Sequence, residues 1–269
     1  MDGNPESADD LTGIGGDESP SGSAGASQAV GRGRLQLVAS PIGNLGDITF
    51  RAAEALKNAN VIACEDTRHT SRLLNHLGVK NKELVALHEH NEQQRSGRLV
   101  ERALSGEVVA YVSDAGMPTI SDPGYRIVRA SYDAGLLVEV LPGACAVVTA
   151  LAGSGMPTDA FYFGGFLPVK SGRRMNELTT ALDRKETSIY YESPHRLLKT
   201  LNALCEIAPE REICVARELT KKFESFHRGQ AQEVRAHFSE VNPKGEITFL
   251  IQGKGNRKQK REKLRPEKK

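Results

Sequence analysis

The sequence of 269 residues contains no tryptophan, and aromatic residues make up only 5% of it. Any hydrophobic core must therefore consist mainly of leucine, valine, isoleucine and alanine. No apolar run approaches the roughly 18 residues that a membrane-spanning helix needs. Residues 1–31 contain no lysine or arginine. They therefore lack the basic segment, followed by an apolar one, that is typical of a secretory signal. These absences favour a globular protein of the cytoplasm.

Cysteine is also scarce, and its spacing excludes the common cysteine-based sites. The four cysteines lie in or beside apolar runs without any CxxC pattern, at Cys64, Cys145, Cys205 and Cys214. This pattern predicts reduced thiols, with neither a disulfide framework nor a zinc site. His88 and His90 could form a metal pair, but no third ligand is obvious, so we favour a solvated loop there and expect no metal.

The net charge is only +2, but the two ends of the chain differ strongly. Residues 1–33 are acidic and rich in glycine and serine, and we predict a disordered tail there. Residues 254–269 carry nine bases and two acids, and helix breakers interrupt them, so a second disordered tail is expected. A basic tail suits a polyanionic partner or serves only solubility, and composition alone leaves both open.

Apolar runs alternate with helical patterns in the first half of the ordered chain. The runs fall at residues 35–39, 61–64, 84–87, 107–112 and 136–141, which predicts a mostly parallel five-stranded sheet with right-handed crossovers. From about residue 157 the pattern changes, with strands expected at 161–163, 187–191, 213–216, 223–229 and 247–251. We therefore predict an α/β fold with two domains, residues 34–155 and 156–253, the second with a mixed sheet.

Small and polar residues follow the predicted strands, above all in the run VSDAGMPTISDPG at 112–124. Ligands of open α/β sheets bind at this carboxyl edge. Several of these polar residues are also typical helix caps, and we interpret Asp47, Asp122 and Ser193 in this way. Neither a dinucleotide fingerprint nor a P-loop nor a GxSxG elbow is present. The residues alone thus predict an enzyme that binds a small polar ligand between its domains.

Nine runs between residues 34 and 252 carry a resemblance to a known family. They are SPIGNLGDIT, ACEDTRHT, HEHNEQQR, VSDAGMPTISDPG, LPGACA, GGFLP, YESPHR, ARELTKKFE and KGEITFLI. In this order they resemble the family of ribosomal RNA small-subunit methyltransferase I, within the tetrapyrrole methylase superfamily. The resemblance implies two α/β domains, S-adenosylmethionine as methyl donor, a homodimer, and methylation of the 2′-hydroxyl of a cytidine in small-subunit (16S) rRNA.

The resemblance also implies donor-binding residues. They are Pro41, Ile42, Gly43, Asp114, Ala115, Gly116, Met117, Gly143, Ala144, Cys145, Ala146, Phe166, Leu167, Gly245 and Glu246. Gly43, Gly116 and Gly143 would let the backbone approach a ligand closely. Asp114 could favour the positive charge of the donor or bind its ribose. The first loop, SPIGNLGD, departs from the GxGPGD-like loop of the tetrapyrrole-modifying members, which favours the RNA branch.

Removal of the hydroxyl proton requires a base, and the sequence offers several at predicted strand ends. The candidates are Glu65, Asp66, Glu192 and Glu218, with Arg68 and Lys221 to hold a phosphate or polarise the hydroxyl. Exposed cations for rRNA binding are expected at Lys170, Arg173, Arg174, Arg196, Lys221 and Lys222. Two other functions stay open, a methyltransferase for a small tetrapyrrole and a non-catalytic RNA-binding protein that kept the fold.

Overall fold

The structure, a computed structural model, describes residues 33–241 and 243–255. The two predicted disordered tails lie almost entirely outside these residues. None of the helices that the structure describes is long and apolar enough to cross a membrane. Within the same residues, no group of three or more histidines, cysteines or carboxylates is placed to hold a metal ion.

The first sheet contains five parallel strands, as predicted. They are β1 (Arg34–Val38), β2 (Val61–Cys64), β3 (Glu83–Ala86), β4 (Val108–Val112) and β5 (Val138–Leu141). Their order in the sheet is β3-β2-β4-β1-β5. The three central strands, β1, β2 and β4, are almost entirely buried, because helices cover both faces of the sheet, whereas the edge strands β3 and β5 are only partly buried.

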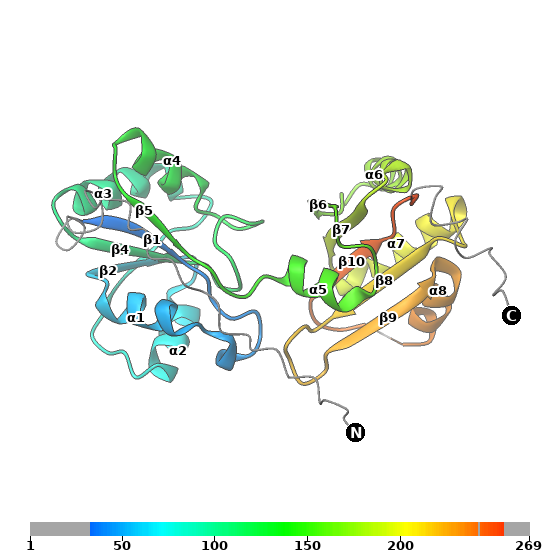
Figure 1. Cartoon of the computed structure of the whole chain (residues 1–269), viewed down its shortest axis with the longest axis horizontal. Coiled ribbons are helices and arrows are strands. Elements are labelled where there is room, and N and C mark those ends of the chain that lie inside the picture. The colour runs from blue at the N-terminus through cyan, green and yellow to red at the C-terminus, as the bar shows by residue number, and fades with distance from the viewer. Residues whose placement is uncertain (1–32, 242, 256–269) are drawn as a thin grey trace, which may run out of the picture. The chain divides into compact units, whose positions relative to one another are not determined.

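Helices α1 (Phe50–Asn58) and α2 (Thr67–His76) cover one face of this sheet, and α3 (Glu92–Leu104) and α4 (Tyr125–Asp133) cover the other (Figure 1). The neighbouring strands β1 and β4 are therefore followed by helices on opposite faces of the sheet, α1 after β1 and α4 after β4. Such a reversal leaves a crevice beyond the carboxyl ends of the two strands. It marks the edge at which a ligand site is expected.

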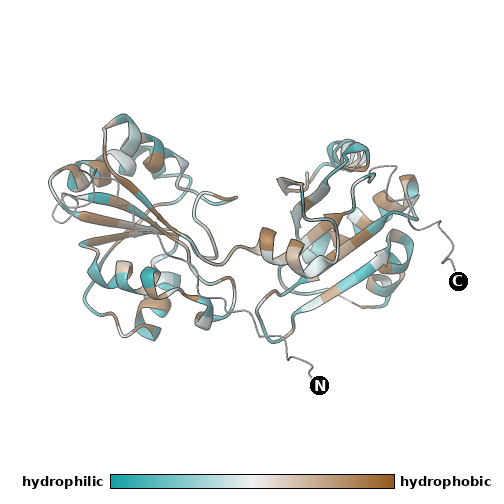
Figure 2. Ribbon diagram, in the orientation of Figure 1, coloured by the Kyte–Doolittle hydropathy of each residue, from teal (hydrophilic) through white to brown (hydrophobic). Residues whose placement is uncertain are grey.

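The second sheet is mixed, also as predicted. It contains β6 (Phe161–Phe166), β7 (Thr187–Glu192), β8 (Glu212–Arg217), β9 (Ser225–Gln230) and β10 (Ile247–Ile251), in the order β6-β7-β10-β8-β9. Only β6 and β7 are parallel. Figure 2 shows hydrophobic residues concentrated on the central strands of both sheets.

Helices α6 (Ser171–Asp183), α7 (Pro194–Ile207) and α8 (Ala231–Glu240) pack on one face of the second sheet. The other face packs against α5 (Ala146–Ser154), whose Val147, Ala150 and Leu151 share a core with Ile189 and Leu250. Helix α5 thus follows β5 of the first sheet but is buried by the second. The domain boundary near residue 155 stays a prediction.

Two predicted helix caps are wrong. Asp47 ends the short 3-10 turn η1 (Leu45–Asp47), and Thr49 instead caps α1 by accepting a hydrogen bond from the Ala52 N–H at 3.1 Å. Asp122 does not cap α4, whose N-cap is Gly124. The Gly124 N–H donates to the buried carboxylate of Glu92 in α3 at 3.0 Å, so a residue distant in sequence satisfies this helix end.

Two further predictions need adjustment. Ser193 is the N-cap of α7 and Pro194 its first residue, as predicted, but the Ser193 side chain makes no capping hydrogen bond. The prediction of exposed cations at Arg173 and Arg174 is wrong in part. Both residues belong to α6, which begins at Ser171. Arg174 is buried and donates to the Val169 carbonyl at 3.2 Å, so it is not available to RNA.

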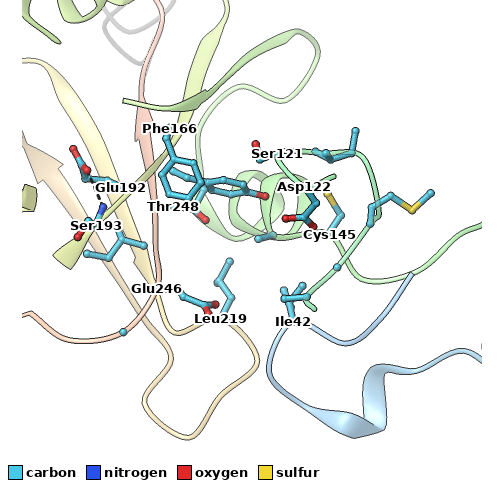
Figure 3. Close-up of a pocket in the computed structure, with 18 of the residues that line it drawn as sticks. Ile42, Ser121, Asp122, Cys145, Phe166, Glu192, Ser193, Leu219, Glu246 and Thr248 are labelled. Atoms are coloured by element: carbon cyan, nitrogen blue, oxygen red, sulfur yellow. Dashed lines mark hydrogen bonds between the residues drawn. The ribbon is translucent and has the colours of Figure 1, made fainter. Parts of the chain in front are cut away.

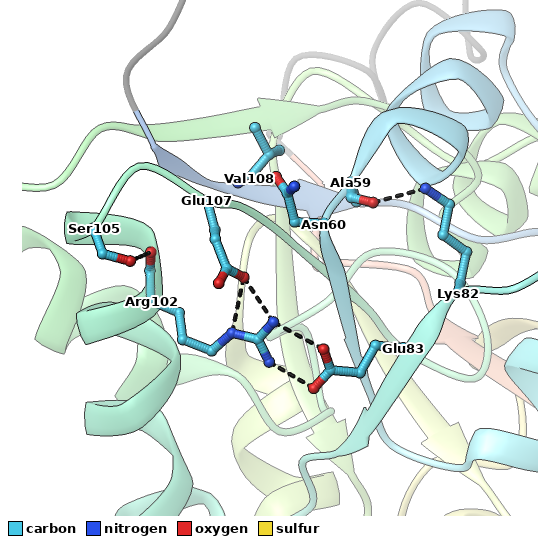
Figure 4. Close-up of polar contacts among 8 residues, drawn as sticks. All are labelled: Ala59, Asn60, Lys82, Glu83, Arg102, Ser105, Glu107 and Val108. Atoms are coloured by element: carbon cyan, nitrogen blue, oxygen red, sulfur yellow. Dashed lines mark hydrogen bonds and ion pairs between the residues drawn. The ribbon is translucent and has the colours of Figure 1, made fainter.

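A polar network ties the strands together at their amino ends, away from the ligand edge. Arg102 of α3 forms ion pairs with Glu83 at 2.6 Å and with Glu107 at 2.7 Å (Figure 4). The Asn60 side chain accepts a hydrogen bond from the Val108 N–H at 2.7 Å, next to the start of β2. These contacts fix the starts of β2, β3 and β4, and the loops at the other ends remain free for a site.

Candidate functional site

Two loops pair at the crevice between β1 and β4. The Ser40 N–H donates to the Gly116 carbonyl at 2.9 Å, and the Gly116 N–H donates back to the Ser40 carbonyl at 3.1 Å. The Ser40 hydroxyl also donates to the Ser113 carbonyl at 3.0 Å. Gly116 adopts a φ of 84°, which favours glycine. Hydrogen bonds thus join the loops that follow two non-consecutive strands.

A pocket of about 350 Å³ opens beside this loop pair (Figure 3). Loops and strand ends that are far apart in sequence line it. The lining residues are Ile42, Ala115, Gly116, Met117, Ile120, Ser121, Asp122, Cys145, Ala146, Phe166, Tyr191, Glu192, Ser193, Pro194, Leu219, Gly245, Glu246, Ile247 and Thr248. We call it the first pocket. Its walls are mostly apolar, with a few carboxylates and hydroxyls, as is typical of sites for small organic ligands.

A second pocket of about 280 Å³ adjoins the first and shares Ile42, Ala115 and Glu246 with it. It lies over the start of α2 and the ends of β1 and β4. The complete lining is Ser40, Pro41, Ile42, Gly43, Leu45, His69, Thr70, Arg72, Leu73, Val112, Ser113, Asp114, Ala115, Lys221 and Glu246. The second pocket carries three side chains that can be cationic, whereas no lysine, arginine or histidine lines the first.

The residues predicted for the donor divide between these pockets. The first pocket contains Ile42, Ala115, Gly116, Met117, Cys145, Ala146, Phe166, Gly245 and Glu246, and the second contains Pro41, Gly43 and Asp114. Three predicted residues line neither pocket. Gly143 lies against Ala39, because a Cβ added at residue 143 would lie 2.7 Å from the Ala39 Cβ. Leu167 is buried in the core between the second sheet and helices α6, α7 and α8. Ala144 packs at the edge of the core that contains Ile42.

The predicted catalytic residues are also separated. Glu192 lines the first pocket and Lys221 the second, whereas Glu65, Asp66, Arg68 and Glu218 line neither. Asp66 is the N-cap of α2 and forms an ion pair with Arg68 at 2.6 Å. The hydrogen bonds from Arg68 lower the pKa of Asp66 far below its usual range. Burial, followed by the charge of Asp114, raises the pKa of Glu65.

Glu192 is buried, and its carboxylate is held by two hydrogen bonds and an ion pair. Its carboxylate accepts hydrogen bonds from the Thr200 hydroxyl at 2.6 Å and from the Ser193 N–H at 2.7 Å, and it forms an ion pair with Arg196 at 2.6 Å. Arg196 also donates to the Leu167 carbonyl at 3.1 Å. This pair therefore fixes the end of β7 at the wall of the first pocket, and Arg196 is not free for RNA.

Lys221 lies between two carboxylates. Its ammonium group is 3.0 Å from Glu218 and 3.1 Å from Glu246. Burial alone would lower the pKa of Lys221, but the hydrogen bonds to Glu218 and Glu246 raise it above the usual value. Glu218 also accepts the Glu246 N–H at 2.9 Å. Glu218 has a φ of 53°, a strained conformation for a non-glycine residue, and its contacts with Lys221 and Glu246 hold the turn in this conformation.

Asp122 differs from Glu192 and Glu218 in its surroundings. It lines the first pocket next to Cys145 (Figure 3), and no ion pair is present for it among the described residues. Burial raises the pKa of Asp122 to about 6, and the charges of Glu65 and Asp114 add to this effect. Its loop is strained, with φ values of 74° at Thr119 and 63° at Ser121. Strain of this kind is typical of functional sites.

Sequence reasoning missed part of the first pocket. The missed lining residues are Ile120, Ser121, Asp122, Tyr191, Ser193, Pro194, Leu219, Ile247 and Thr248. The signal for three of them was present, since they belong to the polar run at 112–124, but Asp122 was interpreted as a cap. Tyr191 lies in a predicted strand, where the sequence pattern does not distinguish a core residue from a pocket residue. Its ring packs edge-on against Phe166, with 5.4 Å between the centroids, and this tertiary contact forms an aromatic wall of the pocket.

The fold and the pockets define a class of α/β protein that binds a small organic ligand at the switch point of a parallel sheet. The family model of the tetrapyrrole (corrin/porphyrin) methylases matches residues 34–235. Proteins named ribosomal RNA small subunit methyltransferase I are similar to this chain over most of their length. The one from Halalkalibacterium halodurans is 47% identical over 88% of this chain and 79% of its own, and the one from Bacillus subtilis is 47% identical over 83% and 76%.

Solved structures share the fold at lower identity. A uroporphyrin-III-C-methyltransferase from Thermus thermophilus has a TM-score of 0.57 at 22% identity, covering 88% of this chain and all of that one. A diphthine synthase has a TM-score of 0.61 at 14% identity, covering 81% and 89%. The chain belongs to the tetrapyrrole methylase family, and within it to the group of the ribosomal RNA small subunit methyltransferases I.

Proposed function

We propose that this chain transfers a methyl group from S-adenosylmethionine to the ribose 2′-hydroxyl of a cytidine in small-subunit (16S) rRNA. Family membership and the names of the 46–48% identical relatives support this proposal. The observation that carries it is the convergence of distant loops on the first pocket. The segments that contribute are Ile42, Ala115–Met117, Cys145–Ala146, Phe166 and Gly245–Glu246.

The first pocket fits the donor in character. Apolar side chains such as Ile42, Phe166 and Leu219 suit the flat adenine ring and the aliphatic chain, and Asp122 and Glu246 complement its positive charges. Gly245 has a φ of 86°, and a Cβ there would lie 2.2 Å from the Glu218 carboxylate, so the turn before β10 needs glycine. When bound, the cofactor supplies an electrophilic methyl group on a positively charged sulfur.

Asp122 is the residue that suits removal of the hydroxyl proton. Among the four predicted bases, Glu192 and Glu218 already accept hydrogen bonds, Asp66 is held by Arg68, and Glu65 lines neither pocket. Asp122 combines a place in the pocket with a pKa of about 6, near the range in which a base works at neutral pH. We therefore assign Glu192, Glu218 and Lys221 to positioning the pocket walls and Asp122 to accepting the proton.

Binding of rRNA is proposed to involve exposed cations around the pockets. Lys170, Arg173 and Lys222 remain exposed, unlike Arg174 and Arg196. Phosphate contacts of this kind position an RNA, whereas the 2′-hydroxyl itself distinguishes it from DNA. We further propose a homodimer, as the resemblance implies, and a location in the cytoplasm with the small ribosomal subunit.

A transfer assay tests the proposed function. Labelled donor is incubated with the full chain and immature small ribosomal subunits, and ribose methylation is then mapped on the rRNA. Label at one cytidine ribose is the expected result. Label on a tetrapyrrole but not on rRNA would contradict the proposal in favour of a small-molecule methyltransferase. Salt-dependent RNA binding without transfer would favour a non-catalytic RNA-binding protein.

A further inference from the structure

We propose that the second pocket binds the acceptor nucleotide of the rRNA and that Arg72 of α2 holds a phosphate beside it. This inference rests on the proposed function, because it assumes that the donor occupies the first pocket. It divides the site between two neighbouring cavities, one for each reactant.

The position of the second pocket suits an acceptor. Transfer of a methyl group requires the attacking oxygen to lie in line with the methyl carbon, and such alignment supplies much of the rate enhancement. Two ligands can meet in this way only where their cavities join. Ile42, Ala115 and Glu246 line both pockets, so the cavities abut at these residues. Asp122 lines the first pocket together with these three shared residues.

The charge of the second pocket points to a phosphate. Arg72, His69 and Lys221 line it, whereas no cationic side chain lines the first pocket. Lys221 is neutralised by Glu218 and Glu246. Arg72 is exposed and has no ion pair within residues 33–241 and 243–255. The guanidinium group of arginine matches a phosphate through two parallel hydrogen bonds, so Arg72 is the side chain suited to this contact.

The neighbouring cation Arg68 provides a contrast within the same helix. Arg68 is engaged by Asp66 through ion-paired contacts as short as 2.6 Å, and it does not line either pocket. The sequence favoured Arg68 for a phosphate because of its position after a predicted strand end. One helical turn further on, Arg72 lines the second pocket without such a partner.

The test compares Arg72→Ala and Arg72→Lys with the control Arg98→Ala. Arg98 is also an exposed arginine without an ion pair among the described residues, but it belongs to α3 on the opposite face of the first sheet. For each variant, kcat and KM are measured with immature small subunits at several salt concentrations. Donor affinity is measured separately by calorimetry.

We expect Arg72→Ala to raise KM for the subunit about tenfold and to lower the slope of log KM against log salt concentration by about one. Arg72→Lys should lie between Arg72→Ala and the wild type, and Arg98→Ala should match the wild type. Donor affinity should stay within about twofold, since the contact is made to RNA. An unchanged KM in Arg72→Ala, or a loss of donor affinity instead, would overturn this assignment while wild-type transfer persists. Absence of wild-type transfer would overturn the proposed function.

Discussion

The guanidinium group of Arg196 lies 2.6 Å from the carboxylate of Glu192, whose side chain is completely buried. Glu192 also accepts hydrogen bonds from Thr200 and Ser193, so it joins the end of β7 to the first turns of α7. Removal of one partner from a buried pair leaves the other charge without compensation. This pair stabilises a pocket wall rather than taking part in the chemistry.

Glu192→Gln should therefore destabilise the protein by about 3–5 kcal/mol, because Arg196 would lose its only ion-pair partner among the described residues. Chemical denaturation monitored by circular dichroism measures this loss. Glu206→Gln on the exposed side of the same helix is the matched control and should change stability little. A variant as stable as the wild type would show that the pair contributes nothing.

Asp122→Asn should lower kcat about 10²- to 10⁴-fold, because the amide cannot accept the hydroxyl proton. In the wild type, activity should fall as the pH drops below about 6, since burial raises the pKa of Asp122 to about 6 and protonation removes the base. The groups that act on Asp122 are Glu65 and Asp114, which raise its pKa further, and Ser113, which lowers it. Donor affinity and pH–rate profiles are measured together.

A stability measurement on Asp122→Asn distinguishes a catalytic loss from misfolding. The folded protein keeps the Asp122 proton to higher pH than the unfolded chain does, so ionisation of Asp122 costs stability as the pH rises from about 4 to 6. The asparagine variant lacks this cost, and its stability relative to the wild type should increase over that range. If the variant instead loses donor affinity and keeps the acid limb of the profile, Asp122 binds the donor and is not the base.

Gly43→Ala should impair methyl transfer while the fold stays intact. A Cβ at residue 43 would lie 2.4 Å from the Cγ of Lys221, so the lysine must move. Its movement would break the contacts of Lys221 with Glu218 and with Glu246, and Glu246 lines both pockets. Gly172→Ala is the control, because a Cβ there meets nothing within 4 Å. Steady-state kinetics of both variants measure the effect. Equal activities of the two variants would show that the close approach of Gly43 to Lys221 is not needed for transfer.

Arg102→Ala should reduce stability without affecting transfer. The two ion pairs of Arg102 join α3 to the amino ends of β3 and β4, at the edge of the sheet opposite to the pockets. Partly exposed pairs of this kind contribute about 1 kcal/mol. Urea titration and the transfer assay are the measurements. A marked loss of kcat at unchanged stability would show that the two edges of the sheet are coupled.

The sequence alone was sufficient for the architecture. The bounds of β2 and β10 were predicted to the residue, and the parallel and mixed sheets were both confirmed. These features depend on local patterns, because alternating apolar runs and helical periods reflect burial along a single element. The polar run at 112–124 also indicated the correct edge of the sheet for the pocket.

Which carboxylates are free was decided only by the tertiary structure. Asp122 was interpreted as a cap, yet the carboxylate of Glu92, thirty residues earlier in the chain, accepts the hydrogen bonds from the backbone N–H groups at the start of α4. Glu192 and Glu218 resembled free bases in the sequence, but the fold brings Arg196 and Lys221 against them. The state of a carboxylate depends on burial and on the charges within a few ångströms. Patterns along the chain do not record those neighbours, and packing determines them.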